Sequence, residues 1–210
     1  MNITLSKAGK RFNRDWIFRN FNFTFSYHNK YAITGPNGSG KSTLLQVIAG
    51  SMNLTEGSID FSNNDSSISI DEIYEQVSIV APYLEVIEEM TAKEFLQFHS
   101  VFKQLLLPID EILSLIGLSQ TKDKQLRNFS SGMKQRIKLA QAIFSDAEIL
   151  LLDEPCTNLD ASGYELYHQL INKFCKSKLV IVSSNDVNEY SFCEHQINIM
   201  DYKSNAFMAQ

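Results

Sequence analysis

Nine consecutive residues, Gly35 to Thr43, have the composition of a phosphate-binding loop. Their sequence, GPNGSGKST, fits the spacing G-x-x-x-x-G-K-[ST]. Glycines let such a loop wrap with its backbone N–H groups pointing inward, and the N-terminus of a following helix adds partial positive charge. The apolar segment KYAIT precedes the loop, and the segment after it has the pattern of a helix that ends at Gly50. The sequence therefore predicts a strand, a phosphate cradle and a helix in succession.

Within this loop, two side chains have an expected chemical task. Lys41 is expected to reach the β- and γ-phosphates of a nucleoside triphosphate, and Ser42 to offer its hydroxyl group to Mg²⁺. A glycine-rich turn that binds nothing is the alternative, and the strand and helix on either side argue against it. The residues expected to bind the nucleotide are Gly35, Pro36, Asn37, Gly38, Ser39, Gly40, Lys41, Ser42 and Thr43.

A pair of carboxylates follows the apolar segment ILLL. In a phosphate-loop fold the carboxylate after such a strand holds Mg²⁺, directly or through water, and Asp153 fits this task. Glu154 stands one residue further on, where it is expected to polarise the water that attacks the γ-phosphate. An Asp-Glu pair after a strand can also be a solvated edge. The phosphate loop upstream favours the catalytic interpretation.

A second apolar run, LVIVSSND, stops on polar residues between Ser183 and Asp186. Four apolar residues in a row suggest a strand that is buried on both faces. Such a strand must end at something that requires two hydroxyl groups and an amide, so these residues are candidates for the same site.

The order of the expected elements indicates an α/β fold with a mainly parallel sheet. Residues 2–26 are β-rich and predict an antiparallel N-terminal part, and buried strands then alternate with helices. Between about residues 91 and 145 the pattern is helical, with no strand, as expected for an inserted helical subdomain. NNDSSIS is expected to be a polar loop, and HQINIMDY a strand followed by a last weak strand. The predicted division is a core of about 1–84 and 146–210 with a helical subdomain of about 85–145.

Composition narrows the class of partner. The chain has 210 residues and a net charge of -5, which argues against nucleic acid as the main partner because phosphate binding requires clustered Lys and Arg. Its three cysteines show no paired spacing, as expected in a reducing compartment. No apolar stretch reaches the roughly 18 residues of a membrane span, and the N-terminus lacks the apolar core of a signal peptide. We therefore expect a cytoplasmic protein that meets a membrane only through a partner.

The segment NFSSGMKQRIKLAQAI, Asn128 to Ile143, lies between the phosphate loop and LLLDEP. It resembles the signature L-S-G-G-Q and the basic helix of ATP-binding-cassette (ABC) ATPases, the nucleotide-binding subunits of ABC transporters, which are P-loop NTPases with a RecA-like core. The resemblance covers nearly the whole chain. It implies that Ser130 and Gly132 contact the γ-phosphate of an ATP held by a second cassette subunit, expected to be an identical copy.

Other positions acquire expected roles from this resemblance. Phe12 falls where the family stacks an aromatic ring on adenine, although either Phe12 or Trp16 can instead be a core residue. The segment TNLD, which ends at Asp160, resembles the loop that touches the opposite subunit. The helical insertion resembles the subdomain that grips an integral membrane permease. This places the chain at the inner face of the cell membrane.

Three departures from the family pattern affect the expected chemistry. The signature has Phe129, Ser131 and Met133 in place of leucine, glycine and glutamine. Pro82 stands nearest to the position of a glutamine that links Mg²⁺ and water to the transporter interface. Asn185 replaces a histidine that contacts the γ-phosphate, and its amide can donate a hydrogen bond but cannot accept a proton. The glutamates that can compensate for Pro82, or be only surface charges, are Glu85, Glu88 and Glu89.

The leading hypothesis is an ATP-binding and ATP-hydrolysing subunit that drives a separate permease through ATP-dependent dimerisation, with Glu154 and Asn185 as catalytic residues. One alternative is a degenerate regulatory cassette that binds ATP, hardly turns over and pairs with another cassette. Another is a soluble ABC ATPase without a transport role.

Overall fold

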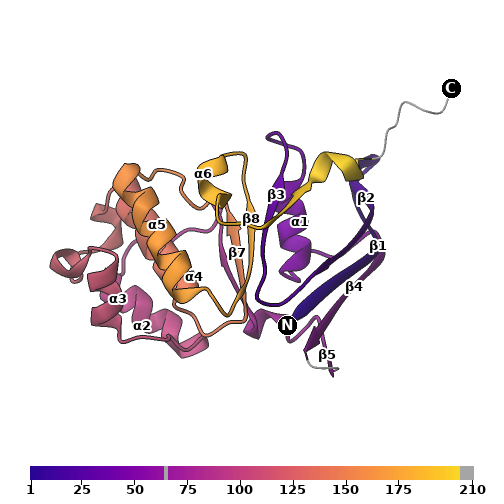
Figure 1. The fold of residues 1–210 in the computed structure, drawn as a ribbon. Coiled ribbons are helices and arrows are strands. Elements are labelled where there is room, and N and C mark those ends of the chain that lie inside the picture. The colour runs from indigo at the N-terminus through magenta and orange to yellow at the C-terminus, as the bar shows by residue number, and fades with distance from the viewer. Residues whose placement is uncertain (64–65, 204–210) are drawn as a thin grey trace.

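The computed structural model describes residues 1–63 and 66–203. Two sheets and a group of helices lie side by side, with the antiparallel sheet at one end and most helices at the other (Figure 1). The mixed α/β architecture with a mainly parallel sheet confirms the predicted fold class. Among the described residues, no helix has the length and apolar character that a membrane span requires.

The antiparallel sheet has the strand order β2-β1-β4-β5. The alternation of buried and exposed side chains in β2 matches the period of two that the sequence shows in FNFTFSY. The strands are β1 (Asn2–Phe12), β2 (Asp15–Phe25), β4 (Glu56–Asn63) and β5 (Ser66–Ile68). The prediction of a loop over NNDSSIS is wrong at β5, because Ser66 to Ile68 pair with β4.

The second sheet is parallel and has the order β6-β7-β8-β3-β9. Strands β7 and β8 are buried at every position, as expected for central strands covered on both faces. The strands are β3 (Lys30–Thr34), β6 (Val77–Val80), β7 (Ile149–Asp153), β8 (Leu179–Ser183) and β9 (His195–Asn198). The predicted strand HQINIMDY is correct only for its first half, because Ile199–Tyr202 form a 3-10 helix. The last weak strand lies outside the described residues.

Helices cover both faces of the parallel sheet, and each face has its own apolar core. Helix α1 (Lys41–Ile48) packs between the two sheets, and the larger group covers the opposite face (Figure 1). The helices of that group are α2 (Ala92–Phe102), α3 (Ile109–Leu115), α4 (Ser131–Ile143) and α5 (Ala161–Phe174). The short helix α6 (Val187–Tyr190), which the sequence analysis missed, follows β8. The parallel strands therefore present their carboxyl ends between two helical layers.

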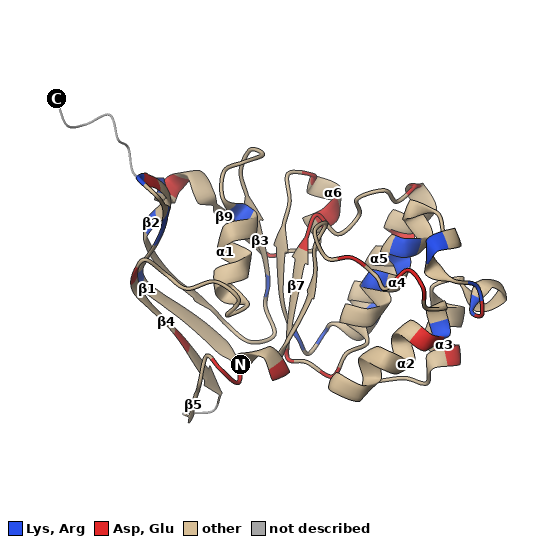
Figure 2. Ribbon diagram, turned by 180° about the vertical axis from the view of Figure 1, so that it is seen from behind, with Lys and Arg blue, Asp and Glu red and all other residues tan. Residues whose placement is uncertain are grey.

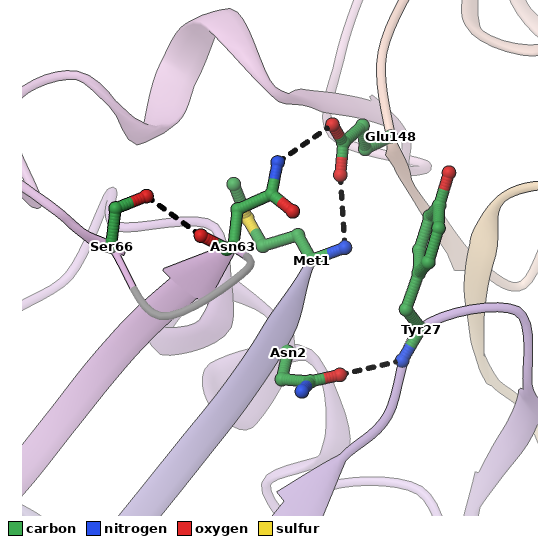
Figure 3. Close-up of polar contacts among 6 residues, drawn as sticks. All are labelled: Met1, Asn2, Tyr27, Asn63, Ser66 and Glu148. Carbon is green, nitrogen blue, oxygen red and sulfur yellow. Dashed lines mark hydrogen bonds and ion pairs between the residues drawn. The ribbon is translucent and has the colours of Figure 1, made fainter.

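Polar contacts at the N-terminus join the two sheets. The amino group of Met1 donates a hydrogen bond to Glu148 Oε2 at 2.9 Å, and Asn63 Nδ2 donates to the other oxygen of the same carboxylate at 3.2 Å (Figure 3). Glu148 directly precedes β7, while Met1 and Asn63 belong to the ends of β1 and β4. These contacts fix the antiparallel sheet against the strand that carries Asp153.

Candidate functional site

The glycine-rich loop lies between β3 and α1, as the sequence predicts. Gly40 directly precedes α1 with φ 106°, a backbone conformation that favours glycine. A Cβ atom at this position would lie 2.2 Å from Ile17 Cγ2, so a larger residue would also clash with β2. The loop surrounds a cavity of about 220 Å³ lined by Ile17, Glu154 and residues 37–43.

The side chain of Lys41 is held inside this loop and is only 5% exposed. Its Nζ atom donates hydrogen bonds to Gly35 O at 2.9 Å, to Pro36 O at 3.4 Å and to Asn185 Oδ1 at 3.1 Å. Asn185 Nδ2 in turn donates to Asn37 Oδ1 at 2.5 Å. Because an ammonium group only donates, the amide oxygen of Asn185 must point to Lys41. The polar end of β8 therefore faces the glycine-rich loop.

Asp153 ends β7 beside this loop and is only 2% exposed. Its Oδ1 atom has no hydrogen-bond partner in the described chain, and the same holds for the hydroxyl groups of Ser39 and Ser183. A buried carboxylate oxygen without a partner is costly, and a bound cation removes that cost. The residues present therefore fit a divalent cation at this position.

The metal preference follows from the oxygen donors. Within residues 1–63 and 66–203, no group of three or more His, Cys, Asp or Glu side chains is placed to hold a metal ion. Mg²⁺ needs no such group, because it keeps several waters and binds through one or two protein oxygens together with substrate phosphates. Asp153 and the hydroxyl group of Ser42, which lines the loop cavity, are suited to that mode of binding.

Glu154 occupies a strained position directly after β7. Its φ of 45° lies in the left-handed region, which costs a residue with a Cβ atom about 1–3 kcal/mol. The Glu154 N–H donates to Ser183 O at 2.9 Å, so β8 helps to hold this conformation. Glu154 lines both the loop cavity and a second cavity of about 320 Å³ that Asn37 and Asn185 also line. The two predicted catalytic side chains therefore lie at one site.

The segment that resembles the family signature, at the start of α4, does not line the cavity of the glycine-rich loop. Ser130 caps helix α4, and its Oγ atom accepts a hydrogen bond from Met133 N at 3.3 Å. The Cα atom of Gly132 lies close to the next segment, since a Cβ there would be 3.2 Å from Asn158 O. Helix α4 covers the face of the parallel sheet opposite to α1 (Figure 1). The described part of one chain therefore does not bring Ser130 and Gly132 to its own phosphate loop.

The departures within the signature have simple physical consequences. Phe129 is buried in the core beneath α4, so a phenyl ring fills the apolar position where the family has leucine. The Lys and Arg positions of α4 are blue on the ribbon in Figure 2, and each of the three has an acidic residue near it. Lys134 pairs with Glu88, Arg136 lies 3.7 Å from Asp160, and Lys138 experiences the charge of Glu85. These cations therefore tie α4 to its neighbours.

Asp160 is engaged as the N-cap of α5. Its Oδ1 atom accepts hydrogen bonds from Ser162 Oγ and from Gly163 N, both at 2.8 Å. These bonds, that from Ser162 first, hold the pKa of the Asp160 carboxyl below its usual value. The predicted contact loop, residues 157–160, therefore leads into α5 and touches α4 through Arg136.

Phe12 lies at the end of β1 and is 45% exposed, so the interpretation of Phe12 as a core residue is wrong. Lys10 Nζ lies 5.3 Å from the centre of its ring. Trp16 is half-buried under two guanidinium groups, with the Cζ atom of Arg19 at 4.5 Å and that of Arg11 at 5.4 Å from its ring centre. Phe12 is therefore an exposed ring with one cation over it, while Trp16 is less exposed and has two guanidinium groups over its ring.

Tyr83 directly follows Pro82, the residue nearest to the position of the lost glutamine, and it is not among the residues predicted for the site. Strands β6 and β7 are in register up to Val80 and Leu152, so the residues after β6 lie beside Asp153. Tyr83 and Gln46 of α1 line the same cavity, and burial and the charge of Asp153 raise the pKa of the Tyr83 phenol. The signal that could have found it is a polar side chain one residue after Pro82. Glu88, one of the glutamates considered, is paired with Lys134.

Comparisons with known proteins agree with this geometry. A glycine-rich loop between a strand and a helix, with a carboxylate at the end of another parallel strand of the same sheet, defines the chain as a P-loop NTPase. The family model for ABC transporters matches residues 18–157. The chain belongs to the ABC transporter family, as an ATP-binding-cassette ATPase.

Curated relatives are similar to most of the chain. The uncharacterized ABC transporter ATP-binding protein YybJ of Bacillus subtilis is 30% identical over 91% of this chain and 89% of its own length. The lantibiotic transport ATP-binding protein SrtF of Streptococcus pyogenes is 29% identical over 88% of this chain and 80% of its own. Other relatives are longer. The chain spans 44% of the Fe(3+) ions import ATP-binding protein FbpC of Fusobacterium nucleatum, at 30% identity.

Solved structures share the fold at lower identity. A putative ABC transporter ATP-binding protein from Pyrococcus furiosus superposes with a TM-score of 0.82 at 22% identity, covering 97% of this chain and all of that one. The ATP-binding cassette MJ0796, a dimer in a post-hydrolysis state bound to ADP and Pi, gives 0.80 at 24% identity over 93% of both chains. At these identities the likeness shows the fold alone.

Proposed function

We propose that this chain hydrolyses ATP to power a separate membrane permease, and that two copies form the working unit. The observation that carries the proposal is the convergence of Lys41, Asp153 and Glu154 at one edge of the sheet, while the N-terminus of α4 lies beside Asn158 and does not line the loop cavity. One chain therefore carries the phosphate-loop half of a nucleotide site and the signature half with Ser130 and Gly132, but it does not bring the two halves together. A second copy supplies the missing half to each phosphate loop.

The residues of the loop divide the work of binding. The backbone N–H groups of residues 38–42 and the N-terminus of α1 attract the phosphates. Lys41 exchanges its bond to the Asn185 amide for a β- or γ-phosphate oxygen, which leaves Asn185 free to turn toward the γ-phosphate. Asp153 and Ser42 hold Mg²⁺, which neutralises phosphate charge when it is bound. Phe12 supplies the aromatic face for adenine.

Glu154 is the proposed general base. Glu154 lines both cavities, where its carboxylate can accept a proton from the water that attacks the γ-phosphate. Asn185 has no basic group, so it orients the phosphate by hydrogen bonding and leaves the proton to Glu154. Ser130 and Gly132 of the second copy, at the N-terminus of its α4, close the site from the other side.

A groove beside β6 suits the permease. The groove has a volume of about 420 Å³ and lies between β6 and helices α2 and α4. Its rim continues into exposed apolar side chains on α2, namely Phe98, Val101 and Phe102. Exposed apolar side chains grouped in this way are typical of a protein-protein interface. Attachment to a permease through this groove places the chain at the cytoplasmic face of the membrane.

The test is Mg²⁺-dependent ATP hydrolysis by the wild type beside Glu154→Gln, with Glu165→Gln on the exposed side of α5 as a matched control. Glu154→Gln keeps the shape but cannot take a proton, so turnover should fall about 100-fold while ATP still binds. Glu165→Gln should behave as the wild type. Equal turnover in the wild type and Glu154→Gln would exclude Glu154 as the base.

A second candidate function is a regulatory cassette that binds ATP and pairs with a catalytically complete one. Asn185 in place of histidine and Pro82 in place of glutamine favour it. The same measurement separates the two, because ATP binding without turnover in the wild type supports the regulatory candidate.

A further inference from the structure

The turn that carries Glu154 is held by hydrogen bonds from three different elements. Strand β8 accepts from the Glu154 N–H through Ser183 O at 2.9 Å. Helix α4 donates to Pro155 O through Gln135 Nε2 at 2.6 Å. After β8, the Oε1 atom of Glu189 in α6 accepts a hydrogen bond from the Cys156 N–H at 2.7 Å. Three successive residues of the turn are therefore each bonded to a separate part of the fold.

Gln135 is an unusual member of α4. It is 6% exposed although it is polar, and it lies one and a half turns after the N-cap Ser130. Its neighbours Lys134 and Arg136 reach outward to Glu88 and Asp160, whereas its own amide reaches inward to the turn. A helix moves as a rigid element, so a shift at its N-terminus moves Gln135 as well.

Glu189 is a second buried polar residue that hydrogen-bonds to the turn. It is 4% exposed on α6, and Tyr167 Oη donates to its backbone oxygen at 2.9 Å. Burial raises the pKa of its carboxyl group, while hydrogen bonds from Ser184 and from Cys156 N lower it. Its side chain points at the backbone of the turn, so its contact with Glu154 is indirect.

We infer that Gln135 and Glu189 are positioning residues that fix the strained turn and thereby the carboxylate of Glu154. A residue with positive φ and a Cβ atom stays in that conformation only when its surroundings hold it there, and these two bonds hold it together with the bond from the Glu154 N–H to Ser183 O. Gln135 also joins the turn to the helix that begins at Ser130, so binding at the N-terminus of α4 is transmitted to Glu154. The inference rests on the proposed role of Glu154 as the base.

The kinetic test compares kcat and KM for ATP in Gln135→Ala, Glu189→Ala and Glu189→Gln. Gln141→Ala is the control, since Gln141 is on the same helix and bonds to His99 instead. A misplaced base should lower kcat about tenfold or more in Gln135→Ala and Glu189→Ala, with KM changed less than about twofold. Glu189→Gln should retain kcat because an amide oxygen still accepts from the Cys156 N–H.

Two outcomes overturn the inference. Unchanged kcat in Gln135→Ala and Glu189→Ala, in a protein whose turnover requires Glu154, shows that the turn needs neither bond. Loss of kcat in Glu189→Gln equal to that in Glu189→Ala shows that Glu189 acts through its charge. Turnover that survives Glu154→Gln is a different failure, because it removes the proposed base itself.

A second measurement monitors the conformation of the Glu154 turn directly and does not depend on ATP hydrolysis. Cys156 lies in the turn with its thiol group buried, and it can be made the single reporter in a Cys175→Ala, Cys193→Ala background. If the two bonds hold the turn, Gln135→Ala and Glu189→Ala should raise the rate of Cys156 labelling by a thiol reagent about tenfold, and Gln141→Ala should not. Equal labelling rates in all variants would contradict the inference.

Discussion

The phosphate-loop edge and the N-terminus of α4 differ in how complete they are. At the loop edge, one chain brings Lys41, Glu154 and Asn185 together around adjoining cavities, with Asp153 buried next to Glu154 at the end of β7. At the N-terminus of α4, Gly132 lies beside the loop of residues 157–160, and neither Ser130 nor Gly132 lines the loop cavity. Under the proposed function, this difference means that binding and activation of ATP are divided between two surfaces, so that a full site requires two chains.

The largest effect on ATP hydrolysis is expected from Gly132→Asp, a change at the N-terminus of α4 that leaves the phosphate loop intact. Gly132→Asp places a negative charge where the second copy's γ-phosphate is proposed to lie, and juxtaposed like charges cost several kcal/mol. Turnover should fall by about 100-fold or more, while ATP affinity measured by calorimetry on the isolated chain stays at the wild-type value. Weakened ATP affinity in the isolated chain would instead assign Gly132 to the chain's own site.

The complementary change acts on the loop edge. Lys41→Ala removes a charge-assisted hydrogen bond to phosphate, and bonds of that kind contribute about 1.5–3 kcal/mol. The Kd for ATP should rise by about 100-fold in calorimetry. Lys176→Ala, an exposed lysine after α5, is the control and should bind as the wild type. An unchanged ATP affinity in Lys41→Ala would show that the glycine-rich loop is not the phosphate-binding site.

Asn185 tests whether positioning at the loop edge is distinct from binding there. Asn185→Ala deletes one neutral hydrogen bond to the γ-phosphate and should lower kcat about tenfold, with ATP affinity changed less than about twofold. Most of the affinity comes from the loop itself, which the variant leaves intact. Comparable losses of kcat and of affinity would show that Asn185 chiefly supports the loop through Lys41 and Asn37.

The smallest expected effect is at the rim. Phe12→Ala removes the exposed ring proposed to stack on adenine, and stacking of a base on an aromatic ring contributes about 1–3 kcal/mol. ATP affinity should fall about fivefold, and the affinity for inorganic triphosphate should not change. Trp16→Leu is the comparison, since that ring is already covered by Arg11 and Arg19. A larger loss from Trp16→Leu would transfer the adenine contact to Trp16.

Much of this arrangement could be predicted from the sequence because its signals are local. The loop and the strand that ends at Asp153 each depend on a few neighbouring residues, and both elements form where predicted. The alternating pattern of buried strands likewise predicted the parallel sheet.

The rest depends on contacts between distant segments. Strand β5 is polar and exists because Ser66 to Ile68 pair with β4, which no local pattern shows. The bond of Asn185 to Lys41 joins residues 144 positions apart. Gln135 and Glu189 look like ordinary surface polar residues until the fold buries them against the turn after Glu154. Their hydrogen bonds are visible only in three dimensions.

The measurement that tests the two-chain site most directly is the mass of Glu154→Gln in solution, by light scattering, with and without Mg²⁺ and ATP. A base that cannot act should trap the ATP-bound state, so the account predicts a dimer with ATP and a monomer without it. Adding Lys41→Ala or Gly132→Asp to this variant should keep the chain monomeric under both conditions, because each removes one half of the shared site. A dimer that forms without ATP, or one that persists in the Gly132→Asp variant, would contradict the account.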